Sequence, residues 1–311
     1  MRFLTLALGA LLTASVSFGP ASASADERIS IGTGGTGGLF YIIGAGMADV
    51  LNKHMEGAFA RAEVTGASIE NIRRVAADQM TFGFSSSSTL YEAKHGEGAF
   101  NEAQPVAAMA YLYPAVLQIA TVEGTGIENF EDLAGKRINL GPPGSNSAVL
   151  AQRLLEAYGV FDPSNVQFLS YTEGTAALLN QTLDATVVLA GAPTSALIDL
   201  GAQREMHLLS LDEDKLGDLL KDYPFYQIYE IEPGTYAGQD STVTVINDPA
   251  TIFTKADASD DLIYGITQAI FDNLPELAQV HPQAKAISTD TATKTPIDLH
   301  PGAARFFDEK K

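Results

Sequence analysis

The first residues able to do chemistry form a glycine-rich loop at positions 29–38, Ile-Ser-Ile-Gly-Thr-Gly-Gly-Thr-Gly-Gly. Ile29 and Ile31 flank a small polar residue and predict a buried strand, and the apolar spacing after the loop predicts a helix that starts at Thr36. The first N–H groups of a helix lack partners inside the helix, and glycines let a ligand approach the backbone closely. The loop therefore predicts an anion-binding turn, to which Thr36 adds a hydroxyl.

Two other interpretations of this loop stay open. Gly32, Gly34 and Gly37 fit the G-x-G-x-x-G pattern of dinucleotide-binding turns. Such a turn usually works with an acidic residue at the end of the next strand, which holds the ribose. The only nearby acid, Glu63, lies inside the strand predicted at 62–65. We therefore favour a small anion over a dinucleotide, and a purely structural glycine turn is the third interpretation.

Hydroxyl-rich loops also follow the next two predicted strands. A strand at 61–65 leads to Ser68, the expected N-cap of a helix at 69–78 that carries Asn71 in its first turn. A strand at 80–84 leads to four serines and a helix at 89–94. Because the carboxyl ends of parallel strands share one edge of a sheet, the three loops predict a ligand site there. Each serine could instead be only a helix cap.

The elements that must position these loops predict two α/β domains. The regular alternation of strands and helices favours parallel sheets. Residues 106–122 predict one long strand that leaves the first domain, and strands at 242–247 and 251–254 are expected to return to it. Later helices are predicted at 260–271, capped by Ser259, and at 277–287. We expect lobe I to comprise residues 26–112 plus 235–311, and lobe II residues 113–234.

The second domain repeats the loop chemistry. A strand at 136–140 is followed by a turn with Ser145, Asn146 and Ser147, then by a helix at 148–158. A further strand at 186–189 leads into a turn that contains Ala192 and Pro193. The first of these turns offers three possible helix caps.

The N-terminus predicts export. Arg2 precedes an uncharged apolar run at 3–18, and small residues at 23–25 form a cleavage signal, so residues 1–25 predict a secretory signal peptide and a mature chain from Asp26. No later stretch is apolar and long enough to span a bilayer. The chain has no cysteine, which excludes disulfides and a lipid anchor on a cysteine. We expect an unanchored protein in the periplasm.

Composition narrows the possible partners and reactions. The formal charge of −19 over 311 residues disfavours nucleic acid and anionic lipid as partners. The five histidines have no metal-ligand spacing, and neither a nucleophile elbow nor a P-loop lysine is present. The acids at 212–214 suit a helix N-terminus by its dipole. We therefore expect a binding protein and not an enzyme, without cofactor or metal and monomeric, although carboxylates could still pair across the fold.

Four segments together resemble one family. They are residues 31–38 with Phe40 and Tyr41, residues 132–138, residues 183–185, and the C-terminal stretch 300–307. They are similar to the TAXI subgroup of substrate-binding proteins of tripartite ATP-independent periplasmic (TRAP) transporters. The resemblance implies a type II periplasmic-binding-protein fold, in which two α/β lobes close on a ligand. Known members bind small carboxylates, including glutamate and 2-oxoglutarate, and serve a permease driven by an ion gradient, usually of sodium.

Carried over motif by motif, the resemblance implies a set of ligand-binding residues in the loops described above. The set is Thr36, Gly37, Gly38, Tyr41, Ser68, Asn71, Ser86, Ser87, Ser145, Asn146, Ser147, Ala192 and Pro193. The expected function is a receptor for a small organic anion (a dicarboxylate, 2-oxoacid or acidic amino acid), held by N–H groups and hydroxyls and not by an arginine, that delivers it to TRAP permease subunits. The alternatives are a receptor for an ATP-driven importer and an exported enzyme.

Overall fold

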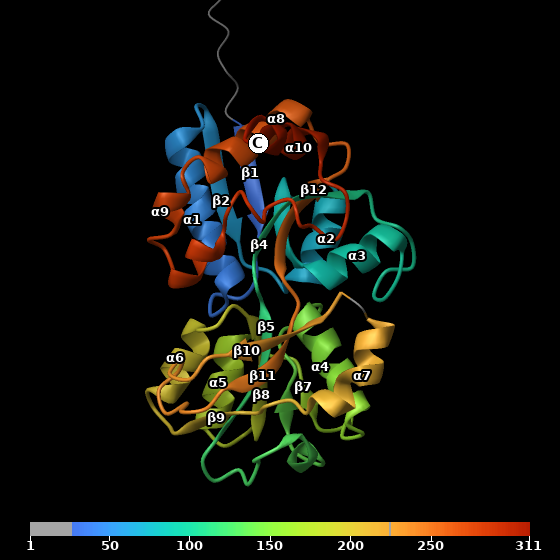
Figure 1. Cartoon of the computed structure of the whole chain (residues 1–311), viewed down its shortest axis with the longest axis vertical. Helices are drawn as coiled ribbons and strands as arrows, with labels where there is room; N and C mark the ends of the chain where they lie inside the picture. Colours follow the sequence, from blue (N-terminus) through green and yellow to red (C-terminus); the bar gives the residue numbers. More distant parts are fainter. Residues whose placement is uncertain (1–26, 224) are drawn as a thin grey trace, which may run out of the picture.

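The computed structural model describes residues 27–223 and 225–311. The predicted signal peptide and Asp26 lie outside the described residues. Figure 1 shows two lobes, one above the other, each with a sheet flanked by helices. Two α/β lobes were predicted, and this part of the prediction is confirmed.

Lobe I is built on a five-stranded sheet with the order β2-β1-β3-β12-β4. β1 is parallel to β2 and β3, as the alternation of strands and helices predicts, whereas β12 is antiparallel to β3 and β4. The strands are β1 (Glu27–Gly32), β2 (Ala58–Glu63), β3 (Phe82–Ser86), β4 (Val106–Tyr113) and β12 (Ala250–Lys255). The helices are α1 (Leu39–His54), α2 (Ser68–Ala76), α3 (Ser87–His95), α8 (Asp260–Phe271), α9 (Leu274–Leu277), η2 (Pro282–Ala286) and α10 (Pro301–Glu309).

Lobe II is built on a second sheet with the order β10-β11-β5-β8-β6-β7, and β9 pairs with β5. The central strands β5 and β8 are buried along their whole length, in keeping with their mostly apolar sequences. The strands are β5 (Val116–Val122), β6 (Ile138–Asn139), β7 (Val166–Gln167), β8 (Ala185–Ala190), β9 (Met206–Leu208), β10 (Gln227–Ile231) and β11 (Val243–Asn247). The helices are η1 (Phe130–Leu133), α4 (Asn146–Ala157), α5 (Tyr171–Leu179), α6 (Ser195–Gly201) and α7 (Glu213–Asp222).

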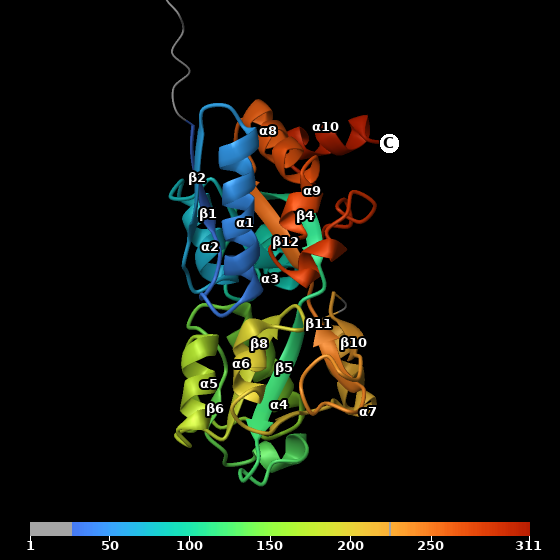
Figure 2. The same ribbon diagram turned by 90° about the vertical axis from the view of Figure 1, so that its left-hand side faces the viewer.

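The chain crosses between the lobes in two adjacent segments. In Figure 2, β4 of the upper lobe leads directly into β5 of the lower lobe. The predicted strand 106–122 therefore does pass from lobe to lobe, but it is interrupted at Pro114, which has no N–H to donate to a ladder. The return crossing runs through Asp248 and Pro249, and the N–H of Asp248 donates to the carbonyl oxygen of Ala115 at 2.8 Å.

One prediction about the strands that lead the chain back to lobe I needs correction. The strand predicted at 242–247 was expected in the first domain, and this was wrong, because β11 pairs with β10 and β5 in the second sheet. Only β12 returns to lobe I. The second crossing therefore lies at 248–249, and not at the predicted boundary between 234 and 235.

Three predicted helix boundaries also need correction. The first helix begins at Leu39 and not at Thr36, because Gly38 is its N-cap. Ser68 is the first residue of α2 and not its cap, since Ala67 takes the N-cap position with a φ of 71°. The helix predicted at 277–287 is split into α9 and η2, the latter beginning at Pro282. Ser259 caps α8 as predicted, by accepting from the N–H of Leu262.

Candidate ligand-binding cleft

A small cavity lies where the two lobes meet. Its volume is about 20 Å³, little more than one water molecule occupies. Lobe I and lobe II both contribute to its wall. The lining residues are Gly34, Gly35, Gly38, Leu39, Phe40, Ala67, Ser68, Ser86, Pro142, Ser145, Asn146, Ser147, Tyr171, Leu189 and Ala190.

Five helices of nine residues or more begin at this cavity. They are α1, α2, α3, α4 and α5. No side chain caps α1 or α2, whereas the Ser145 hydroxyl accepts from the N–H of Ala148 in α4. At the start of α3, the N–H groups of Ser87 and Ser88 donate to Pro249 and Asp248. The first turns of α1 and α2 thus keep their partial positive charge directed at the cavity.

Ser86 provides a hydroxyl that the protein does not use. The residue is only 1% exposed. Its N–H donates to the Ser68 hydroxyl oxygen at 3.0 Å, but its own hydroxyl has no hydrogen-bond partner within residues 27–223 and 225–311. A buried hydroxyl that borders a cavity and lacks a partner is available to a ligand.

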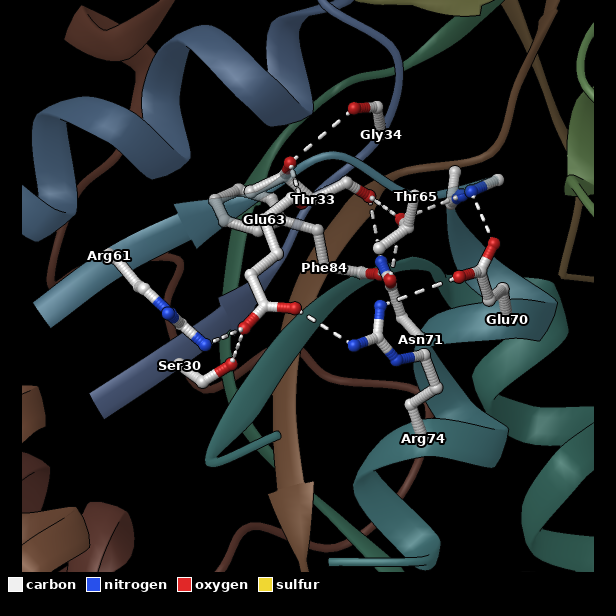
Figure 3. Close-up of polar contacts among 12 residues, drawn as sticks. Ser30, Thr33, Gly34, Arg61, Glu63, Thr65, Glu70, Asn71, Arg74 and Phe84 are labelled. Carbon is white, nitrogen blue, oxygen red and sulfur yellow. Dashed lines mark hydrogen bonds and ion pairs between the residues drawn. The ribbon is translucent and has the colours of Figure 1, made fainter. Parts of the chain in front are cut away.

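Asn71 lies beneath the cavity and braces the loops around it. Figure 3 shows its side chain among the ends of the first strands. Its Nδ2 donates to the carbonyl oxygens of Thr33 at 2.7 Å and Phe84 at 2.8 Å. Its Oδ1 accepts from the Thr65 hydroxyl at 2.7 Å. With these contacts made and the residue fully buried, Asn71 acts on the site through the backbone that it holds.

Glu63 has a structural role that argues against the dinucleotide interpretation. Its carboxylate accepts hydrogen bonds from the Ser30 hydroxyl at 2.6 Å, from Arg74 at 2.8 Å and from Arg61 at 3.0 Å (Figure 3). The hydrogen bond from Ser30, followed by the contacts with Arg74, holds the pKa of this carboxyl below its usual range. A carboxylate occupied in this way is not free to hold a ribose.

The predicted ligand-binding residues divide into two groups. Six of them line the cavity: Gly38, Ser68, Ser86, Ser145, Asn146 and Ser147. The others do not. Thr36 is exposed and borders, with Gly37, a separate depression against α5 and α6. The Ser87 hydroxyl contacts the Thr251 hydroxyl at 2.9 Å.

Three other predicted residues lie close to the cavity wall without lining it. Tyr41 is half-buried one position beyond Phe40, which does line the wall. Ala192 and Pro193 follow β8, and it is Leu189 and Ala190 at the end of that strand that face the cavity.

Sequence reasoning missed the apolar wall. Leu39, Phe40, Tyr171, Leu189 and Ala190 all line the cavity. The first two belong to the apolar pattern that predicts α1, and Leu189 lies in the predicted strand 186–189. Nothing in that pattern separates an apolar residue that faces the core from one that faces a ligand.

The lobes are closed on each other on both sides of the cavity. On one side, Asn146 Nδ2 donates to Asp248 at 2.6 Å and to the Ser88 hydroxyl at 3.1 Å. Arg153 of α4 forms an ion pair with Glu92 of α3 at 2.7 Å. On the other side, the Ser195 hydroxyl donates to the carbonyl oxygen of Gly37 at 3.3 Å. A ligand in the cavity would therefore be contacted by both lobes.

The cavity wall carries no charged side chain. The nearest buried acid is Asp248, which contacts Asn146 and Ser88 from behind. Burial raises the pKa of Asp248 from its usual 3.8 to about 6, against the lowering effect of the Ser88 and Asn146 hydrogen bonds. No group of three or more metal-ligating side chains occurs in the described part of the chain.

Residues 31–310 match the model of the NMT1-like family. The chain belongs to this family. Several solved structures share its fold at low sequence identity. With the periplasmic aliphatic sulphonate binding protein SsuA from Escherichia coli, the TM-score is 0.50 at 16% identity, over 91% of this chain and 78% of that one.

Two further neighbours of this family member have higher TM-scores. A binding protein component of an ABC phosphonate transporter from Pseudomonas aeruginosa gives 0.54 at 13% identity, over 85% of this chain and 80% of that one. MatC from Rhodopseudomonas palustris with bound malate gives a TM-score of 0.57 at 12% identity, over 91% of this chain and 97% of that one. These likenesses confirm the predicted periplasmic-binding-protein fold. Among the described helices, none combines the length and apolarity needed to cross a membrane.

Proposed function

We propose that this protein is a periplasmic solute receptor that encloses a small organic anion between its lobes. The observation that carries the proposal is the combination of two uncapped helix N-termini and the unpartnered Ser86 hydroxyl at one cavity between the lobes. Backbone N–H groups and hydroxyls in a water-poor site bind an anion strongly without a counter-charge from a side chain. The net charge of −19 repels an anion at long range, so the N–H dipoles must outweigh it at short range.

The same wall argues against an exported enzyme. General acid–base chemistry near neutral pH needs a group that titrates there. The only cavity-lining side chain with a shifted pKa is Tyr171, where burial raises it to about 12. Its hydroxyl is held by the backbone of Leu189, donating to the carbonyl oxygen at 3.0 Å and accepting from the N–H at 3.2 Å.

For the partner, we propose a TRAP-type permease driven by an ion gradient. The support is the resemblance of the glycine loop and of the C-terminal tail at 300–307 to the TAXI subgroup. The competing candidate is an ATP-driven importer, the class named for the phosphonate-binding neighbour. Uptake of radiolabelled ligand into vesicles with the cognate membrane subunits separates the two, because a sodium ionophore abolishes one and ATP depletion the other.

Two neighbouring serines provide a matched test of the site. Removing the Ser86 hydroxyl should weaken anion binding by about 10- to 100-fold, the effect of losing one hydrogen bond to a charged group. Ser87→Ala removes an identical hydroxyl that faces Thr251, and it should leave affinity unchanged while lowering stability. Titration calorimetry with a panel of small carboxylates measures both. Equal effects of the two substitutions, or no carboxylate binding to the wild type, would contradict the proposal.

A further inference from the structure

The cavity has one polar end and one apolar wall. The polar end consists of the first turns of α1 and α2 with the hydroxyls of Ser68 and Ser86. Opposite them, lobe II adds Ser147 and Asn146, but the Ser147 hydroxyl already donates to the carbonyl oxygen of Leu140 at 2.8 Å. Asn146 Nδ2 is likewise committed to Asp248 and Ser88. The side-chain donors on the lobe II side are therefore taken, whereas the free Ser86 hydroxyl and the uncapped first turns of α1 and α2 lie on the lobe I side.

The rest of the wall carries no charged side chain and no unpaired side-chain donor. It is formed by Leu39, Phe40, Leu189 and Ala190, together with the ring of Tyr171. The polar atom of Tyr171 is occupied by the backbone of Leu189. No arginine or lysine among the described residues lines the cavity. A second carboxylate would thus be buried against carbon, which is strongly disfavoured without a partner.

The acidic side chains behind the cavity wall also disfavour a second carboxylate. Asp248 is fully buried and contacts Asn146, which itself lines the cavity. Glu92 lies on α3 four residues beyond Ser88, but Arg153 compensates its charge at 2.7 Å. The nearest buried carboxylate without an ion-pair partner is therefore Asp248, which lies behind Asn146 and supplies no positive charge for a second anionic group.

Size limits the ligand as well. With the lobes in contact on both sides, the enclosed volume is about 20 Å³. Because this space holds little more than one water molecule, each carbon of a ligand must displace packed side chains, which favours a short ligand over a long one.

Resting on the proposed function, we propose that the cavity selects short monocarboxylates, with or without a 2-oxo or 2-hydroxy group, and excludes dicarboxylates. The single carboxylate would take the free donors at α1, α2 and Ser86, while the short carbon chain would lie against Leu39, Phe40 and Leu189. This narrows the ligand to a class that excludes glutamate and 2-oxoglutarate, the ligands implied by the resemblance.

Matched ligand pairs test this with the wild-type protein. Titration calorimetry of propionate against malonate, and of butyrate against succinate, compares acids that differ by one carboxylate in place of a methyl group. We expect each monocarboxylate to bind at least about 100-fold more tightly than its dicarboxylate partner. Dicarboxylate binding equal to or tighter than that of the monocarboxylate would overturn the inference and leave the anion receptor standing. Absence of binding by all four acids would overturn both.

One substitution tests the apolar wall separately. Phe40→Ala removes a half-buried ring that lines the cavity and packs against Phe84, with the ring centroids 5.3 Å apart. In this variant, hexanoate should gain at least about tenfold in affinity relative to propionate, because the new space is apolar. Succinate should remain excluded. A gain for succinate instead would show that a second carboxylate finds a partner, and would overturn the inference.

Discussion

Asp248 should make the protein less stable as the pH rises through the mildly acidic range. Its carboxylate is fully buried where the chain returns to lobe I. It accepts from the N–H of Ser88 at 2.9 Å, from the Ser88 hydroxyl and from Asn146 Nδ2 at 2.6 Å. These bonds favour the charged form, but burial outweighs them and raises its pKa from 3.8 to about 6, with a smaller contribution from the charge of Glu92.

The sign follows from proton binding. Between the two pKa values the folded protein holds a proton that the unfolded chain has released, so the free energy of unfolding falls with rising pH. The difference of about 2.2 between the pKa values corresponds to about 3 kcal/mol, present at low pH and lost as the pH passes about 6. Between pH 4 and pH 7, the loss amounts to about 2.5 kcal/mol.

Asp248→Asn isolates this contribution, because the amide keeps the shape of the side chain and does not titrate. Urea denaturation at pH 4, 5, 6 and 7 gives the free energy of unfolding for the wild type and the variant. The wild-type value minus the variant value should fall by about 2.5 kcal/mol across the series. Asp257→Asn, at an exposed carboxylate, is the control and should follow the wild type. A difference between wild type and Asp248→Asn that stays flat or rises with pH would refute the reasoning.

Three other changes test the site from different directions. Gly66→Ala would place a methyl carbon 2.5 Å from the carbonyl oxygen of Pro143 across the lobes. It should disfavour closure and weaken ligand binding at least about tenfold by calorimetry while leaving the ligand-free melting temperature unchanged, and an unchanged affinity would contradict this. Asn71→Ala removes three buried hydrogen bonds and should lower the free energy of unfolding, measured by urea denaturation, by about 3 kcal/mol. A loss below about 1 kcal/mol would mean that the loops keep their conformation without the Asn71 side chain. Thr36→Val changes an exposed side chain outside the cavity and should alter ligand affinity by no more than about twofold. A larger loss of affinity would show that Thr36 contacts the ligand.

Several features of the fold followed from short-range patterns in the sequence. The cap at Ser259 and the extent of α8 depend on neighbouring residues alone, and both were predicted correctly. The passage from β4 to β5 was also predicted, because an apolar, β-prone run too long for one strand of one domain indicates a strand that continues into the next. The alternation of strands and helices indicated two α/β lobes in the same way.

Sheet membership depends instead on contacts between distant segments. The sequence of β11 resembles that of any buried strand, and only its pairing with β10 and β5 places it in lobe II. Only the tertiary structure therefore shows that the chain crosses back from lobe II to lobe I at Asp248. The contacts of Asp248 with Ser88 and Asn146, far away in the chain, came with it.

The same distinction holds within the site. The sequence by itself determined that hydroxyl and glycine loops gather at the ends of strands, and six of the predicted residues do line the cavity. Only the tertiary structure decided that Ser86 faces the cavity while Ser87 faces Thr251, because β12 pairs with β3 and the helix α3 begins at residue 87. It also decided that Leu39 and Phe40 form a wall of the cavity, because that wall exists only once lobe II closes against them. Local spacing specifies an element, whereas the direction in which each of its side chains points depends on what packs against it.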